Sequence, residues 1–331
     1  MKKIFYFQWH ITDHCNNRCK HCYIHKKDFD KHEVSEVNAV QIIEDMKHCC
    51  EELGVSPQVS ITGGDPLRHS HVFKIIKGIK DIGGTVRVLG NPELITEETV
   101  KKLIDLKIKT YQVSIDGMEE MHDSIRSKGS FNRTTSAIRL MLDMGLSVSA
   151  LTTVSSLNQF QIAQVMDYVY SFGIKRWSFS RHIPDNGSMG MDAASYFSFM
   201  KYIVKKHEPY TEMGISLPTK DPLMLTIQGN PVCGGDCVSG GCGLGSSMLT
   251  ILPDNTIMGC RRHAGSILGD WKRKGDLINY FLFHPKMDSY RDITKIKKCG
   301  SCKLLNQCRG CRAAAYAATG DIYGVDPHCN L

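Results

Sequence analysis

The sequence has no apolar run approaching the roughly 20 residues needed to cross a bilayer. Gln8 and His10 interrupt its first apolar stretch and no small-residue cleavage site follows, so we expect a first β-strand there instead of a signal peptide. It also lacks a basic block interleaved with aromatic residues, because the lysines behind its net charge of +7 are scattered. These absences predict a cytoplasmic protein with no membrane or nucleic-acid partner.

Cysteine, in contrast, is abundant. The chain of 331 residues has 14 cysteines, and it is much longer than the usual disulfide-stapled secreted domain. Three stand at positions 15, 19 and 22, two at 49 and 50, and nine between 233 and 329. In a reducing compartment, clustered cysteines are more typical of metal ligands than of disulfides. Cys49 and Cys50 fall within a helical pattern, and we interpret them as packing residues.

Strand and helix patterns alternate over the first half of the chain. Glycines at 54, 83, 145 and 173 are expected to end helices, and Asn158 to cap one. An apolar stripe that includes Val37, Val40 and Ile43 marks the first helix. Six such units predict a parallel sheet, open or curled into a partial barrel, with ligands at the carboxyl ends of the strands. The expected strands are 4–11, 57–62, 85–90, 109–115, 147–154 and 175–181.

The rest of the chain is less regular. A helix is expected near 192–207, and a hairpin around the turn at Pro253, Asp254 and Asn255. From residue 233 onward glycine and cysteine become frequent and regular periodicity mostly ends. We predict two domains, covering residues 1–215 and 216–331.

Cys15, Cys19 and Cys22 follow the first expected strand within one short loop. Three thiolates so close in sequence suit a [4Fe–4S] cluster, since cysteine thiolates hold such clusters. Three ligands would leave one of the four irons open to a ligand that is not protein. Zinc is the alternative, because a nearby histidine would complete a four-ligand site. The histidines in question are His14, His21 and His25.

The loop resembles the CxxxCxxC signature of the radical S-adenosylmethionine (SAM) enzymes, with His21 where many members carry an aromatic residue. Gly63-Gly64-Asp65-Pro66 resembles the GGE-type turn of that family, and 113–117 with Arg126 resembles its VSIDG…HD..R segment. The resemblance implies that SAM chelates the open iron and is cleaved to a 5′-deoxyadenosyl radical. It also implies that Ser114 and Arg126 hold the SAM carboxylate and that Asp116 lies near the ribose.

The C-terminal cysteines resemble the SPASM extension of radical SAM enzymes; a zinc ribbon is the alternative, although the five-residue spacer between its knuckles is short. The implied fold is a partial (β/α)6 TIM-like radical SAM barrel with a Cys-rich SPASM domain. Two auxiliary [4Fe–4S] clusters are implied, three clusters in all. The first cluster would be held by Cys242, Cys260, Cys311 and an upstream cysteine, which is Cys237 or else Cys233. The second cluster would be held by Cys299, Cys302, Cys308 and Cys329.

SPASM enzymes mostly modify peptides, and we favour a peptide substrate over a small molecule. A zinc or iron–sulfur electron carrier is a third hypothesis, against which the two SAM-like motifs argue. Arg261 stands where sulfatase maturases carry a catalytic Asp, which disfavours sulfatase-type oxidation and makes Arg261 a possible cleft residue. Cys233 is either a spare thiol or a hydrogen-atom donor. No N-terminal leader-binding domain is expected, so a separate recognition protein is an expected partner, with flavodoxin or ferredoxin as electron donor.

Overall fold

The computed structural model describes residues 3–24, 32–183, 189–218, 221–228 and 241–331. Its internal contacts divide the chain into two compact units. The first unit consists of residues 1–113, 132–148 and 244–291, and the second of residues 114–131, 149–243 and 292–331.

The first unit is built on a sheet of parallel strands. Within it the strand order is β4-β3-β2-β1-β7-β8-β9. Strands β1 to β4 and β7 pair in parallel, whereas β8 pairs antiparallel with both β7 and β9. The strands are β1 (Ile4–Thr12), β2 (Ser56–Gly63), β3 (Thr85–Leu89), β4 (Thr110–Ser114), β7 (Met248–Ile251), β8 (Thr256–Met258) and β9 (Ile267–Asp270).

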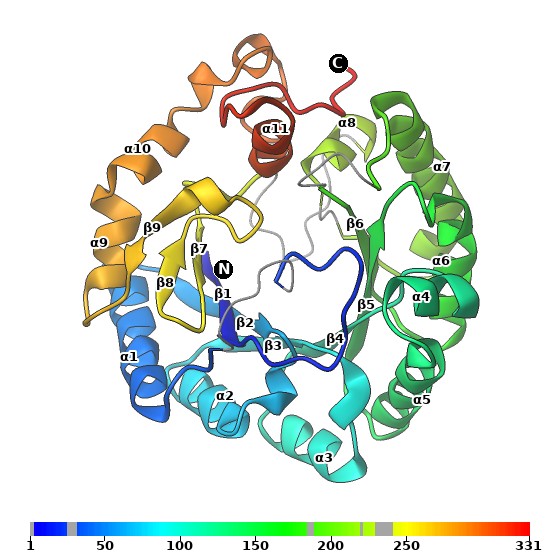
Figure 1. Cartoon of the computed structure of the whole chain (residues 1–331), viewed down its shortest axis with the longest axis horizontal. Helices are drawn as coiled ribbons and strands as arrows, with labels where there is room; N and C mark the ends of the chain where they lie inside the picture. Colours follow the sequence, from blue (N-terminus) through cyan, green and yellow to red (C-terminus); the bar gives the residue numbers. More distant parts are fainter. Residues whose placement is uncertain (1–2, 25–31, 184–188, 219–220, 229–240) are drawn as a thin grey trace. The chain divides into compact units, whose positions relative to one another are not determined.

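Helices cover one face of these strands (Figure 1). They are α1 (Glu36–Glu52), α2 (Val72–Asp81), α3 (Glu97–Asp105), α5 (Ser130–Asp143), α9 (Asp276–Phe283) and α10 (Pro285–Arg291). Alternate residues of β1 supply the apolar side, where Phe7, Trp9 and Ile11 are fully buried. Phe5 meets Phe281 of α9 edge-on, with the ring centroids 4.7 Å apart. From Gln8 onward the opposite side of β1 carries the polar side chains Gln8, His10 and Thr12, as alternation along a strand requires.

A buried carboxylate joins α1 to α9. Asp45 of α1 accepts hydrogen bonds from the backbone N–H groups of Gly275 (2.7 Å) and Leu277 (3.1 Å) and from the indole of Trp271 (2.9 Å). The first backbone N–H groups of a helix have no partner inside the helix and attract negative charge. Asp45 therefore completes the start of α9 and fixes it against α1.

The second unit holds β5 (Val148–Val154) and β6 (Trp177–Arg181), which pair in parallel. Its helices are α4 (Glu119–Ile125), α6 (Ile162–Ser171), α7 (Ala193–Glu212), α8 (Leu225–Gln228) and α11 (Arg312–Thr319). Strands β1 to β6 are each followed by a helix, which confirms the predicted fold class of a partial (β/α)6 barrel. The expected strands all form, within two residues at either end.

The predictions for individual residues were confirmed in part. The four helix-ending glycines all have positive φ, as does Asn255 in the predicted hairpin turn. The apolar stripe predicted for α1 was only partly right: its members Ile43 and Met46 are buried, but Val37 and Val40 are 66% and 58% exposed. Ile42, Cys49 and Cys50 complete the buried side of α1. Both cysteines are packing residues as predicted, and burial raises their thiol pKa values, that of Cys50 to about 12.

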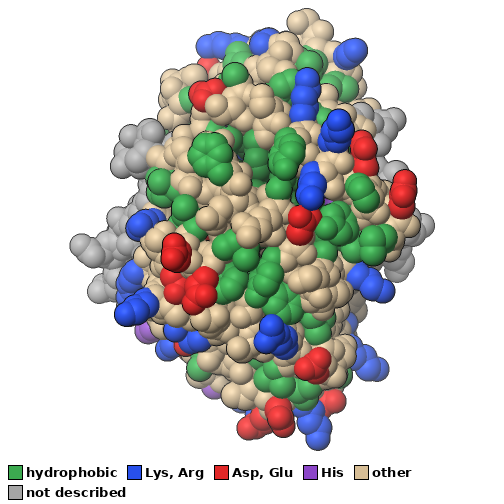
Figure 2. Space-filling model, turned by 90° about the vertical axis from the view of Figure 1, so that its right-hand side faces the viewer, with side chains coloured by type: hydrophobic (Ala, Val, Ile, Leu, Met, Phe, Trp, Pro, Cys, Tyr) green, Lys and Arg blue, Asp and Glu red, His purple; other side chains and the backbone are tan. Residues whose placement is uncertain are grey.

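None of the helices in the described part of the chain has the length and apolar character that a membrane crossing requires. On the face drawn in Figure 2, lysine and arginine side chains are interspersed with acidic, apolar and uncharged ones. That distribution agrees with the interpretation of the positive net charge as scattered surface lysines.

Candidate functional site

The glycine turn after β2 lies directly against the segment that leads into the first cysteine loop. The Gly64 N–H donates to Thr12 O (2.7 Å) and the Asp65 N–H donates to His14 O (2.8 Å). Gly63 has φ +130, and a Cβ there would overlap the Thr12 carbonyl, while one on Gly64 would overlap that of His14. Only glycine permits this approach. The contact places the turn beside Cys15.

Asp65 is fully buried and only partly satisfied. Its Oδ1 accepts from the Leu67 N–H (3.4 Å), whereas Oδ2 has no hydrogen-bond partner among the described residues. Burial raises the pKa of the Asp65 carboxyl to about 7, and its charge acts on the nearby Cys15 thiol. A buried, unpartnered carboxylate oxygen is costly unless a cation or donor joins it. The turn thus fits an ammonium group next to the cysteine loop.

The cysteine loop is a compact, half-buried turn. The Cys22 N–H donates to Cys19 O (3.0 Å), and Arg18 Nη1 donates to Cys15 O (2.9 Å). Burial raises the pKa of Cys15, and the charges of Asp65 and Cys22 raise it further. His21 is half-buried within the same loop. The loop holds the three predicted cluster ligands close to the turn that contains Asp65.

The predicted SAM residues of the second unit form an ion pair. Arg126 Nε lies 2.6 Å from Asp116 Oδ2, and Asp116 Oδ1 accepts from the Thr153 N–H (2.8 Å). Asp116 is fully buried and Arg126 is partly exposed, so the carboxylate orients the guanidinium. Ser114 is the last residue of β4. The ribose contact predicted for Asp116 and the carboxylate contacts of Ser114 and Arg126 stay predictions.

Two residues that we did not predict hold the Asp116 turn. His122 Nδ1 accepts from the Asp116 N–H (3.2 Å), and Asn158 Nδ2 donates to Asp116 O (2.7 Å) and Thr153 O (2.8 Å). Asn158 stands at the predicted N-cap position, before the 3₁₀ turn Gln159–Gln161, but its side chain makes no cap hydrogen bond and joins the ends of two strands instead. The only feature of the sequence that could have indicated this role is the position of Asn158 after β5, and that position is equally typical of a helix cap.

The cysteines of the predicted second auxiliary set are neighbours in the second unit. Burial is the main cause that raises the pKa of Cys299 and the pKa of Cys308, the latter to about 11. The charges of Cys302 and Cys329 raise the pKa of Cys299 further, and those of Cys329 and Cys299 act in the same direction on Cys308. No three His, Cys, Asp or Glu side chains of the described residues are close enough to hold one metal ion. The ligand set predicted for this cluster stays a prediction.

A buried ionic network lies under these cysteines. Arg181 Nη1 donates to Asp326 Oδ1 (2.8 Å), and its Nε lies 2.8 Å from Asp221 Oδ2. Asp326 also accepts from the N–H groups of Cys311 (2.7 Å) and His328 (3.0 Å). The network fixes the backbone next to Cys311 and Cys329. Asp221 and Asp326 were not predicted, because each reads in sequence as an ordinary Asp-Pro turn.

The first auxiliary set is only partly described. Cys242 donates its N–H to Cys308 O (3.4 Å), and Cys311 is buried at the start of α11. Cys260 lies in the first unit, and Cys233 and Cys237 lie outside the described residues. This ligand set stays a prediction.

Arg261 lies beside the polar side of β1. Its guanidinium is 5.9 Å from the centroid of the Tyr23 ring, and the His10 and Tyr23 rings meet with centroids 6.3 Å apart. Burial and the charge of Arg261 lower the pKa of His10 to about 3, so this imidazole is neutral. Arg261 therefore lies near both His10, close to the end of β1, and Tyr23, which directly follows the first cysteine loop.

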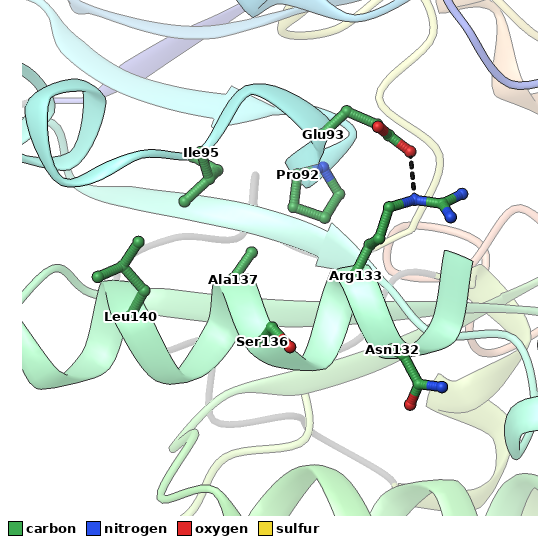
Figure 3. A pocket seen from close by; sticks show the side chains of 8 residues that line it. All are labelled: Pro92, Glu93, Ile95, Asn132, Arg133, Ser136, Ala137 and Leu140. Carbon is green, nitrogen blue, oxygen red and sulfur yellow. Dashed lines mark hydrogen bonds and ion pairs between the residues drawn. The ribbon is translucent and has the colours of Figure 1, made fainter. Parts of the chain in front are cut away.

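A hollow in the first unit is lined by eight residues (Figure 3). Its walls come from the short 3₁₀ helix Pro92–Leu94 and from α5, and Glu93 and Arg133 form an ion pair at one end, with Oε1 and Nε 2.5 Å apart. The lining contains no cysteine, histidine or aromatic residue. We assign it no catalytic role.

The parallel fold, the cysteine loop and the glycine turn together define a radical SAM domain. Residues 9–169 match the Radical SAM superfamily, and the chain is a radical SAM enzyme.

Relatives of two kinds resemble almost the whole chain. An AdoMet-dependent heme synthase of Methanosarcina barkeri is 26% identical, covering 97% of this chain and 95% of that protein. The mycofactocin maturase MftC of Mycolicibacterium smegmatis is 24% identical, covering 97% and 81%. The crystal structure of Streptococcus suis SuiB bound to its precursor peptide SuiA shares the fold, with a TM-score of 0.78 at 19% identity over 100% of this chain and 77% of that one.

Proposed function

We propose that Cys15, Cys19 and Cys22 hold the SAM-binding [4Fe–4S] cluster and that the chain uses it to modify a peptide. The observation that carries the site assignment is the close approach of the turn at Gly63 and Gly64 to residues 12–14, which brings Asp65 Oδ2, without a hydrogen-bond partner among the described residues, beside Cys15. When bound, the cluster and SAM would supply one-electron cleavage of the sulfonium and a 5′-deoxyadenosyl radical that abstracts a substrate hydrogen.

The residues around the loop have separate roles in this proposal. Asp65 Oδ2 would accept a hydrogen bond from the amino group of SAM, and the glycine turn would offer backbone at close range. Ser114 and Arg126 bind the SAM carboxylate, and Asp116 keeps the guanidinium of Arg126 in place through their ion pair. His21 lies within the loop and shields the cluster from solvent.

Two auxiliary clusters complete the cofactor set. Cys299, Cys302, Cys308 and Cys329 would hold one, which their mutual electrostatic effects support. Cys242, Cys260, Cys311 and Cys237 would hold the other. An electron donor such as flavodoxin or ferredoxin would supply the electron for each SAM cleavage.

Metal analysis after anaerobic reconstitution tests this set. We expect about twelve irons per chain, four for each cluster, with no zinc. Cys302→Ala should fall to about eight irons, whereas Cys50→Ala, which changes a packing cysteine, should keep about twelve. About four irons together with bound zinc would contradict the auxiliary clusters and leave the SAM cluster intact.

The peptide substrate has its support in the relatives. One is named a mycofactocin maturase, and SuiB was solved with a precursor peptide. A short Cys- or Gly-rich open reading frame beside the gene would supply a test peptide. Incubation with SAM and reductant should then change its mass, and the 5′-deoxyadenosine should carry deuterium when the peptide is deuterated at the reacting carbon.

A tetrapyrrole substrate is the second candidate, because the M. barkeri heme synthase matches this chain from end to end. The discriminating experiment gives the loaded enzyme iron coproporphyrin III or the peptide in parallel. Deuterium transfer from the peptide alone supports the first candidate, and transfer from the porphyrin alone supports the second.

A further inference from the structure

A continuous polar row crosses the face of the first unit's sheet that faces away from its helices. The register aligns Thr250 of β7 with Gln8 of β1, Gln8 with Ser60 of β2, and Ser60 with Arg87 of β3. Register partners in parallel strands point to the same side, so these four side chains share one face. All four residues are buried. The interior of a closed parallel barrel is ordinarily packed with Val, Ile and Leu.

Several buried polar atoms on this face have no hydrogen-bond partner among the described residues. Gln8 Nε2, Thr250 Oγ1 and, two residues along β1, His10 Nε2 are buried without a hydrogen-bond partner in the part of the chain that the structure describes. Gln8, His10 and Thr250 are 3%, 1% and 0% exposed. Native proteins satisfy almost all such groups. Three on one face therefore indicate a polar ligand group that completes them.

Arg261 gives this face a positive charge. Its guanidinium interacts electrostatically with Tyr6 and His10, which stand on either side of Gln8 along the same face of β1. Among the described residues it forms no ion pair, and its neighbour Tyr23 contacts it through the ring. The polar row contains no acidic residue. The unsatisfied groups are mostly donors next to a cation, and such a set selects an anionic oxygen group.

We propose that Gln8, His10, Thr250 and Arg261 bind a carboxylate of the substrate. Arg261 supplies the counter-charge, and the amide of Gln8 and the hydroxyl of Thr250 donate hydrogen bonds to its oxygens. This inference rests on the proposed radical SAM chemistry and names the group by which the substrate is held. A glutamate side chain of a peptide and a propionate of a tetrapyrrole carry the same carboxylate chemistry.

Binding of paired acid and neutral probes to the reconstituted chain tests the proposal. One pair is the capped peptide Gly-Gly-Glu-Gly-Gly and its Gln counterpart; the other is coproporphyrin III and its tetramethyl ester. Isothermal titration should show the acid form of one pair binding at least about tenfold more tightly than its neutral form. The pair that shows the preference identifies the source of the carboxylate.

Variants at Arg261 and Arg262 test whether Arg261 is the source of the preference for the acid form. R261Q should reduce it to about twofold or less and R261K should keep most of it, because the charge sets the affinity. R262Q is the matched control and should keep the full preference. Equal binding of acid and neutral forms in both pairs, or an acid preference that survives in R261Q, overturns the proposal.

A second measurement separates binding from folding. T250V removes an unpaired buried hydroxyl, so its unfolding midpoint should stay equal or rise while its affinity for the preferred acid probe falls several-fold. Unchanged affinity in T250V contradicts the role of the row. Failure of the proposed function would appear elsewhere, as a wild-type chain that forms no 5′-deoxyadenosine from SAM and reductant even though it binds the acid probe.

Discussion

At the scale of single residues, two adjacent glycines decide where the cysteine loop and Asp65 meet. Gly63 combines a left-handed backbone with direct apposition to the Thr12 carbonyl, whereas Gly83 has φ +79 and nothing near its missing Cβ. A comparison of Gly63 with Gly83 therefore separates the cost of backbone strain from the cost of steric overlap. Both residues have positive φ, but only Gly63 has atoms close to where a Cβ would lie.

We predict that Gly63→Ala destabilises the chain by at least about 2 kcal/mol, since the strand ends must separate to admit the methyl group. Gly83→Ala, the control, should cost about 1 kcal/mol from backbone strain alone. Urea unfolding of both variants measures the difference. Equal losses of stability would show that the close approach at Gly63 is absent in solution.

The neutral His10 gives a second residue-scale prediction. Its pKa in the folded chain is lowered to about 3, by burial and by Arg261, so below pH 6.5 the unfolded chain binds a proton that the folded chain does not. Stability should therefore fall as the pH falls. The contribution of His10 should be about 2 kcal/mol between pH 7.5 and 5.

Urea unfolding of wild type and His10→Gln at these two pH values measures that contribution. The variant should lose less stability than wild type on acidification, by that amount. An identical loss in both proteins would show that His10 titrates normally in the folded chain.

At the scale of elements, the link between α1 and α9 depends on one carboxylate. Asp45→Ala should destabilise the chain by about 3 kcal/mol, because the start of α9 and the Trp271 indole lose their acceptor. Glu44→Ala changes the exposed neighbouring acid and should stay within about 0.5 kcal/mol. Thermal or urea unfolding compares them, and a small effect at Asp45 would mean that α9 is held by apolar packing alone.

Most elements could be predicted from sequence because their signals are local. Alternating strands, helix-ending glycines and the Asn255 turn each depend on a few consecutive residues. The pairing of β7 with β1 could not be predicted in this way, since it joins positions about 240 residues apart and nothing in either strand specifies the other. Val37 and Val40 were wrongly assigned to the buried side of α1, because an apolar side chain near the start of a helix can also stay exposed to solvent.

The same distinction between local sequence signals and contacts between distant segments applies to the candidate site. The cysteine loop, the glycine turn and the Asp116 segment are short motifs and were found in sequence. Asn158, Asp221 and Asp326 act through contacts with distant segments, and in sequence they read as turn or cap residues. The polar row was invisible too, because Gln8 and Thr250 become neighbours only when β1 and β7 pair.

At the scale of the whole molecule, the cysteines of the described chain divide by environment. Cys49 and Cys50 are buried in a helix and serve packing, whereas Cys15, Cys19 and Cys22 are half-buried in a loop beside a costly carboxylate. The costly carboxylate next to the loop, more than cysteine number, supports our proposal that the loop is the reactive centre. A heme synthase and a mycofactocin maturase both resemble almost the whole chain, so this overall resemblance leaves the substrate open.

The most direct test of the central claim is the yield of 5′-deoxyadenosine from the reconstituted chain with SAM and a strong reductant. Wild type should form it, Cys15→Ala should form none, and Cys302→Ala should keep part of the activity because its SAM cluster is intact. Product from Cys15→Ala at the wild-type level, or none from the fully loaded wild type, would contradict the assignment of this loop as the site of SAM cleavage.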